Sequence, residues 1–137
     1  MQNRPTVFYV DDNPSSRRLL TGVFRESSFE VITASGPIEA LDRSRNICFD
    51  LALVDYQMPF MSGSELAQEM KLIHPHIPVV MISGCVVLPA AELRFVDAHF
   101  GSGTALDDLI TAMRMLLSPK PPSAASAGRA SQWADLT

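Results

Sequence analysis

Short apolar segments alternate with amphipathic segments along most of this chain. Four apolar runs show no alternation of apolar and polar positions, and a shorter fifth run follows them; the five cover residues 6–10, 31–33, 51–54, 78–83 and 98–100. Runs of this kind are typical of strands buried on both faces, as the strands of a parallel sheet are. The pattern therefore predicts five strands.

Between these runs, apolar residues recur at the spacing of a helix. This spacing predicts helices over residues 15–26, 36–46, 63–73 and 105–117, and a weaker helical segment lies between the last two strands. Pro14 and Pro37 are expected at the starts of the first two helices, where a proline costs no hydrogen bond. The alternation of strands and helices predicts an α/β fold: a doubly wound parallel sheet with right-handed crossovers and helices on both faces.

Composition sets further bounds on the chain of 137 residues, which is 47% hydrophobic and 19% charged. We expect one domain over residues 1–117 and a disordered tail over residues 118–137, where Pro, Ala and Ser predominate. The net charge of −4 leaves no basic face for phosphates, so nucleic acid is not an expected partner.

Cys48 and Cys85 have no CxxC partner and are expected to be small buried residues in a reducing compartment. With no secretory signal or membrane-length apolar run in view, we expect a cytoplasmic protein without membrane contact.

Acidic residues follow two of the predicted strands. Asp11 and Asp12 end the first strand, Asp55 ends the third, and Ser83 with Gly84 ends the fourth. Binding clefts of open α/β sheets lie beyond the carboxyl ends of the strands. Carboxylates gathered there suit Mg²⁺, and a carboxylate beside that ion can accept a phosphoryl group. A hydroxyl from Ser83 and the backbone N–H of Gly84 could hold the phosphoryl oxygens.

A simpler interpretation of these residues is structural. Asp11 and Asp12 precede Pro14, so they could cap the helix that begins there. Asp55 could belong to an ordinary loop between a strand and a helix. The placement of carboxylates at the same predicted sheet edge favours the chemical interpretation.

The motifs at these strand ends resemble those of response-regulator receiver domains of two-component signalling. The similarity covers roughly residues 5–117 and is carried by YVDDN around Asp11 and Asp12, DYQMPFMSG beginning at Asp55, and MISG around Ser83. The resemblance implies a flavodoxin-like (βα)5 fold with strand order 2-1-3-4-5. It implies that Asp55 is the phosphoacceptor and that Ser83 is the switch hydroxyl. It also implies that Mg²⁺ is held by Asp11, Asp12, Asp55 and the backbone carbonyl of Gln57.

The chain departs from the family pattern near the fifth predicted strand. The family has a lysine, usually followed by proline, where this sequence has Ser102 and Gly103, and the only lysines here are Lys71 and Lys120. Because an ammonium group would offset the charge of Asp55 and the phosphoryl group, we expect slower phosphorylation or a weaker switch.

Two more departures concern the same region. His99 occupies the position of a family Tyr or Phe; we interpret it as a partly exposed histidine at a sheet edge or as a pH-sensitive switch residue. The segment after Ser83 is about three residues shorter than usual and contains Pro89, so the fourth helix should be short or irregular. Its apolar residues 86–88 could be partly exposed.

The leading functional hypothesis is a stand-alone receiver, a signalling module rather than an enzyme. It would be phosphorylated on Asp55 by a sensor histidine kinase or phosphotransfer protein. A downstream protein would bind its helix 4–strand 5–helix 5 face, which consists of the short helix expected after Ser83, the strand at residues 98–100 and the helix at residues 105–117. A homodimer is an alternative use of that face. The main alternative is a degenerate pseudo-receiver that acts as a phosphorylation-independent scaffold. An aspartyl phosphatase is less consistent with the sequence, because Gln57 stands where such an enzyme has a second catalytic Asp. A flavin protein is also less consistent with it, because the acidic strand ends would repel the flavin phosphate.

Overall fold

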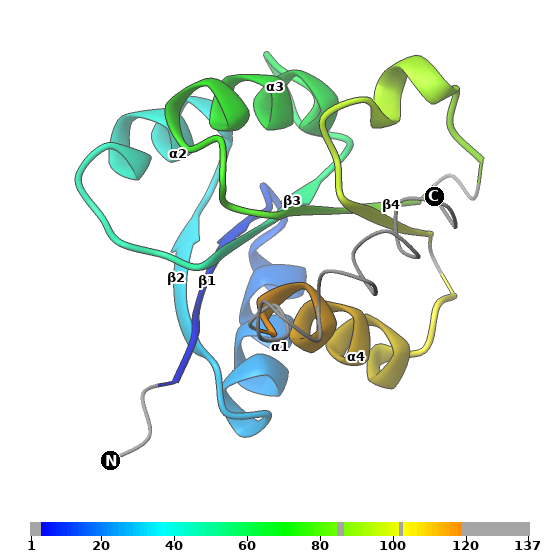
Figure 1. Ribbon diagram of the computed structural model, residues 1–137. Helices are drawn as coiled ribbons and strands as arrows, with labels where there is room; N and C mark the ends of the chain where they lie inside the picture. Colours follow the sequence, from blue (N-terminus) through cyan, green and yellow to red (C-terminus); the bar gives the residue numbers. More distant parts are fainter. Residues whose placement is uncertain (1–3, 85–86, 102, 119–137) are drawn as a thin grey trace, which may run out of the picture.

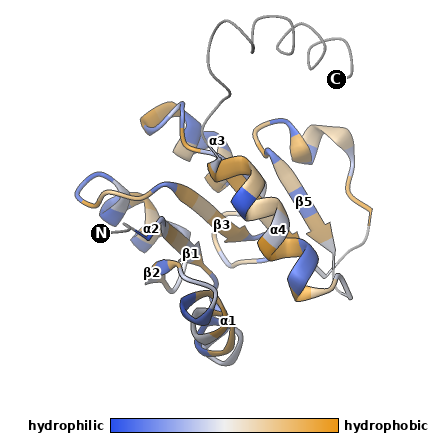
Figure 2. Cartoon of the chain, turned by 60° about the horizontal axis from the view of Figure 1, so that its bottom comes forward, coloured by the Kyte–Doolittle hydropathy of each residue, from blue (hydrophilic) through white to orange (hydrophobic). Residues whose placement is uncertain are grey.

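A central parallel sheet organises the computed structural model, which describes residues 4–84, 87–101 and 103–118. The sheet has the order β2-β1-β3-β4-β5 (Figure 1), and the fold prediction is confirmed. Its strands are β1 (Thr6–Val10), β2 (Glu30–Ala34), β3 (Leu51–Asp55), β4 (Val79–Ser83) and β5 (Ala98–Gly101). Most of their residues are buried, and the central strands β1 and β3 are mostly hydrophobic in Figure 2.

Helices cover both faces of this sheet. They are α1 (Pro14–Glu26), α2 (Pro37–Ser44), α3 (Gly63–Ile73), the 3-10 helix η1 (Ala90–Leu93) and α4 (Leu106–Leu117). Figure 1 shows α2 and α3 on one side of the sheet and α1 and α4 on the other. Each side has its own core, one around Phe8, Val54 and Met81 and the other around Tyr9, Phe24 and Met113. Both apolar faces of the strands are therefore used, as the uninterrupted apolar runs predict.

In the described part of the segment between β4 and β5, residues 84 and 87–97, the helical structure is the four-residue helix η1, as expected from the segment's length and from Pro89. Val87 is exposed, whereas Leu88 packs on the core. The carbonyl oxygen of Glu92 accepts a hydrogen bond from Ser64 Oγ at 2.5 Å, and its Oε1 accepts one from Tyr56 at 3.0 Å. These contacts attach η1 to α3 and to the residue that follows Asp55.

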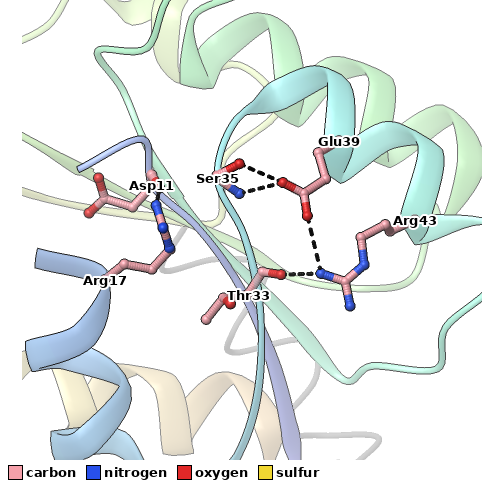
Figure 3. A network of polar contacts seen from close by, with 6 residues as sticks. All are labelled: Asp11, Arg17, Thr33, Ser35, Glu39 and Arg43. Atoms are coloured by element: carbon pink, nitrogen blue, oxygen red, sulfur yellow. Dashed lines mark hydrogen bonds and ion pairs between the residues drawn. The ribbon is translucent and has the colours of Figure 1, made fainter. Parts of the chain in front are cut away.

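A second polar network attaches α2 to the end of β2. Glu39 Oε1 accepts hydrogen bonds from the backbone N and the Oγ of Ser35 at 2.9 and 2.6 Å, and Arg43 donates to the Thr33 carbonyl (Figure 3). The bonds from Ser35 are the main reason that the pKa of Glu39 lies below its ordinary value. The network keeps the end of β2 in place beside β1.

The composition predicted two buried cysteines and a tail over residues 118–137, and the structure tests only part of this. Cys48 is exposed rather than buried, because it lies in the α2–β3 loop while its neighbour Phe49 fills the core. The predicted tail lies outside the described residues from residue 119 onward, as do Cys85 and Ser102. No helix in the described part of the chain is long and apolar enough to cross a membrane.

Candidate functional site

Three carboxylates meet at the carboxyl ends of β1 and β3. The two strands are parallel neighbours, and Val10 pairs with Val54, so the residues that follow them lie side by side. One carboxylate oxygen from each of Asp11, Asp12 and Asp55 lies within 4.8 Å of the others. Asp11 is buried, Asp12 is exposed and Asp55 is intermediate. The structure thus brings together the three acidic residues selected from the sequence.

Asp11 is held by hydrogen bonds on both carboxylate oxygens. Its Oδ2 accepts a bond from the Tyr9 hydroxyl at 2.6 Å, and its Oδ1 accepts one from the backbone N–H of Asn13 at 2.9 Å. Its carbonyl oxygen also accepts a bond from Arg17 at 2.7 Å (Figure 3). The carboxylate therefore has a fixed orientation toward the site.

The helix-capping alternative for the acidic pair does not hold. Asn13 is the N-cap of α1, and its side chain accepts hydrogen bonds from the backbone N–H groups of Ser15 and Ser16. Asp11 supports this turn only indirectly, through the backbone N–H of Asn13. Asp12 is left exposed beside Asp55.

Asp55 is positioned by the loop that leads into α3. Gly63 packs so closely under this loop that a Cβ there would lie 2.5 Å from the Asp55 carbonyl oxygen and 2.8 Å from the Tyr56 Cα. The backbone N–H of Gly63 donates to the Tyr56 carbonyl at 2.8 Å. A capping box between Ser62 and Glu65 fixes the first turn of α3. Only glycine permits this approach, which explains the glycine eight residues after Asp55.

The electrostatics of the cluster are unfavourable without a cation. Burial, followed by the charges of Asp11 and Asp12, raises the pKa of Asp55 from 3.8 to about 6. Backbone N–H groups of Gln57 and Tyr56 oppose this shift only partly. Burial and the neighbouring Asp11 also raise the pKa of Tyr9 well above its ordinary value, so its hydroxyl stays a donor.

A cleft of about 380 Å³ opens over these carboxylates. Its polar lining includes Asp11, Asp12, Asn13, Ser16, Asp55, Gln57, Ser83, Gly84 and Thr104, and its apolar lining includes Leu20, Ile82, Phe100, Leu106 and Leu109. Of the selected site residues that the structure describes, the cleft therefore contains all except His99. None of the described residues that line it is Lys, Arg or His.

His99 lies away from this cleft. Its strand neighbours Ala98 and Phe100 pack in the core on the α1 and α4 side of the sheet, so His99 faces the opposite side. It pairs with Met81 of β4 in the sheet register. Its Nε2 atom is buried without a hydrogen-bond partner in the described part of the chain. A switch role for His99 would have to act through the packing of β5.

Sequence reasoning did not select Tyr9 or Thr104. Tyr9 carried a usable signal, because residues two apart on a strand share a face, and a tyrosine two positions before an acidic residue can bond to it. Thr104 had no such signal, since its place in the cleft depends on the course of the β5–α4 loop.

The comparisons with known proteins agree with this geometry. The family model of the response regulator receiver domain matches residues 7–95. Sporulation initiation phosphotransferase F of Bacillus subtilis is 28% identical over 118 residues, which are 83% of this chain and 94% of that protein. The response regulator TrrA of Thermotoga maritima, solved in complex with Mg²⁺-BeF, has a TM-score of 0.78 at 25% identity and covers 82% of this chain and 99% of its own. A structure of the histidine kinase ThkA in complex with TrrA has a TM-score of 0.76 at 26% identity, and the match covers 83% of this chain and 99% of the matched chain.

Fold and site define a signalling module built on a parallel α/β sheet. The chain belongs to the response-regulator receiver domain family, the phosphorylation-accepting part of two-component systems. Against four other curated relatives it spans only 5%, 17%, 50% and 35% of their lengths. What those longer proteins do as a whole is therefore not transferred to it.

Proposed function

We propose that this receiver domain, within residues 1–117, accepts a phosphoryl group on Asp55 with Mg²⁺ in the cleft. The donor would be a sensor histidine kinase or a phosphotransfer protein, the class of partner that TrrA has in its complex with ThkA. The observation that carries the proposal is the cluster of Asp11, Asp12 and Asp55 within 4.8 Å in the lining of the cleft.

The donor set fits Mg²⁺. Carboxylate and carbonyl oxygens are the ligands that this ion prefers, and the cluster offers three carboxylates. Gln57 lines the same cleft, and we assign its backbone carbonyl as a further ligand. Burial, followed by the charges of Asp11 and Asp12, raises the pKa of Asp55, and a divalent cation would offset those charges. Both oxygens of Asp11 already accept hydrogen bonds, so we assign Asp12 and Asp55 as direct ligands and Asp11 as a ligand through water. When bound, Mg²⁺ would offset the charge of the carboxylates and the incoming phosphoryl group.

The chemistry is a displacement at phosphorus. A carboxylate oxygen of Asp55 forms the new P–O bond while the bond from phosphorus to the donor's imidazole nitrogen breaks, and the electron pair of that bond stays on the imidazole. Ser83 and Gly84 line the cleft and would donate hydrogen bonds to the phosphoryl oxygens. The histidine of the donor enters from the open side of the cleft.

The output would be a protein contact made by η1, β5 and α4, which follow one another in the chain. Val87 and Met115 in this region are exposed apolar side chains, at 83% and 65%. Tyr56 follows Asp55 and bonds to Glu92 in η1, so a change at Asp55 has a direct route to this face. A downstream partner would therefore distinguish the phosphorylated state by the position of η1.

Intact mass measurement after incubation with acetyl phosphate tests the proposal. We expect the mass of one added phosphoryl group only when Mg²⁺ is present. The Asp55→Asn variant should remain unmodified. The matched variant Asp42→Asn, which removes an exposed carboxylate of α2 outside the cluster, should be modified like the wild type.

A second measurement does not depend on turnover. A ligand that binds only the folded state raises the melting temperature, so millimolar Mg²⁺ should raise that of the wild type and of Asp42→Asn but not of Asp12→Asn. Absence of both the mass increase and the thermal shift would instead assign the chain as a pseudo-receiver scaffold.

A further inference from the structure

The cleft over Asp55 lacks a positive charge within the described part of the chain. Lys71 is engaged at the opposite end of β4, where its Nζ donates to Asp97 Oδ2 at 2.8 Å and to the Ile77 carbonyl at 2.9 Å. Arg94 lies over the Phe95 ring at 5.3 Å and lines a different pocket. Arg17 comes close but donates to the Asp11 carbonyl and does not line the cleft.

This lack matters most when Asp55 is phosphorylated. A phosphoryl group carries about −1.5 to −2 charges near neutral pH, and it would stand beside the carboxylates of Asp11 and Asp12. One Mg²⁺ offsets about half of that total, so close to two negative charges would remain in a partly buried cleft. Uncompensated charge in such a place is costly, and a further cation would lower the barrier to phosphorylation.

The lining of the cleft combines acidic and apolar residues, the two kinds of surface that a lysine side chain contacts. Its floor is acidic, and one wall is apolar where α1 and α4 contribute Leu20 and Leu106. Leu106 is 40% exposed, so part of this wall is uncovered. A lysine combines a four-carbon apolar stem with a terminal ammonium group and commonly buries the stem along apolar surface. The stem would lie on the leucines and the ammonium would reach the carboxylates.

Two basic residues of the chain, Lys120 and Arg129, lie outside the described residues. Helix α4 begins at the cleft with Leu106 and ends at Leu117, about 17 Å away at the rise of an α-helix. Lys120 follows Leu117 by three residues in the sequence.

We propose that a protein partner completes this cleft by inserting one lysine side chain, with its stem on Leu20 and Leu106 and its ammonium group beside the phosphoryl group of Asp55. The inference rests on the proposed function, because it concerns the phosphorylated site. It makes efficient phosphorylation of this receiver conditional on the partner that supplies the charge in trans.

Chemical complementation tests the need for the charge. The initial rate of Asp55 phosphorylation by acetyl phosphate and Mg²⁺ is measured by intact mass, with n-butylammonium as a mimic of the lysine side chain. We expect a saturable, several-fold increase over tetramethylammonium at equal ionic strength. Leu106→Ala should weaken this increase, whereas Leu19→Ala, which truncates an exposed α1 leucine outside the cleft, should not.

A second test introduces a lysine into the cleft by substitution. Thr104 lines the cleft, and Thr111 is an exposed position further along α4. Thr104→Lys should phosphorylate several-fold faster than wild type and lose its response to n-butylammonium. Thr111→Lys makes the same change in net charge and should behave like the wild type.

The partner's role is tested with a helical peptide that presents one lysine a turn away from two leucines. It should accelerate phosphorylation at a lower concentration than n-butylammonium, and the same peptide with norleucine in place of lysine should not. A fall in the basal rate of Arg129→Gln or Lys120→Gln would assign the site to the chain's own tail and overturn the proposal.

The two proposals fail in different ways. If Asp55 is phosphorylated equally fast with and without n-butylammonium, and Thr104→Lys is no faster, the inference is wrong while the proposed function stands. If neither the wild type nor Thr104→Lys is phosphorylated under any of these conditions, the proposed function itself is wrong.

Discussion

The Tyr9 hydroxyl donates a hydrogen bond of 2.6 Å to Oδ2 of Asp11, and both residues are almost completely buried. They lie two positions apart along the direction of β1, so their side chains share one side of the sheet. A buried carboxylate is costly unless it is hydrogen-bonded. The pair thus allows an acidic residue to sit at the base of the cleft with its orientation fixed.

Replacing Tyr9 with Phe should reveal the strength of this bond. The variant keeps the ring in the core and leaves Asp11 with one partner fewer, so the free energy of unfolding should fall by about 1.5–3 kcal/mol, the range for a bond to a charged group. Urea denaturation at neutral pH measures the change. In a double-mutant cycle with Asp11→Asn, we expect a coupling of about 1 kcal/mol or more; additive effects would show that the bond contributes nothing specific.

Stability should depend on pH through Asp55. Its pKa is 3.8 in a free chain and about 6 in the folded protein, so between these values the native state keeps a proton that the unfolded chain has lost. The native state then binds more protons, and its stability falls as the pH rises through this window. Asp55→Asn removes the penalty and should be more stable than wild type at about pH 7.5, by about 1–2 kcal/mol once solvent screening is allowed for.

Unfolding curves at several pH values check the sign of this effect. The advantage of Asp55→Asn should shrink as the pH is lowered and vanish below the free-chain pKa of 3.8, where wild-type Asp55 is protonated in both states. Asp42→Asn should show no comparable advantage at any pH. An Asp55→Asn variant that is less stable than wild type at neutral pH would mean that burial and the neighbouring carboxylates do not penalise the charged form of Asp55.

Gly63 should be intolerant of even a methyl group. The added Cβ of Gly63→Ala would lie 2.5 Å from the Asp55 carbonyl oxygen, and backbone atoms there cannot move without shifting the phosphoacceptor. We expect a loss of about 1–3 kcal/mol and slower phosphorylation, measured by urea denaturation and intact mass. Gly22→Ala is the matched control, because a Cβ there meets nothing within 4 Å; in the middle of α1 it should stabilise by about 0.5–1 kcal/mol.

Most of the fold followed from patterns that act locally. The run that forms β1 shows no alternation of apolar and polar positions, and the helical spacing of apolar residues in α4 leaves little choice of buried face. Both elements match their predicted ranges closely. The convergence of Asp11, Asp12 and Asp55 also followed, because parallel strands end at one edge. These inferences need only the periodicity of each element and the topology of the sheet.

Other features depend on contacts between distant segments and could not be predicted. The link from Tyr56 to Glu92 joins residues 36 positions apart, and nothing local in either segment signals it. The place of Thr104 in the cleft depends in the same way on how the β5–α4 loop folds over the sheet edge. The absence of lysine near β5 is visible in the sequence, but only the structure places Lys71, Arg94 and Arg17 at other partners.

His99 offers the last prediction, because its Nε2 atom is buried without a hydrogen-bond partner in the described residues. A buried polar atom without a partner costs about 1–3 kcal/mol, and an apolar group of similar shape avoids that cost. His99→Phe should therefore raise the free energy of unfolding by about 1 kcal/mol, measured by urea denaturation, while His76→Phe at an exposed position should leave it nearly unchanged. If His99→Phe is destabilising instead, the Nε2 atom has a partner in solution, and a role for this histidine as a polar switch gains support.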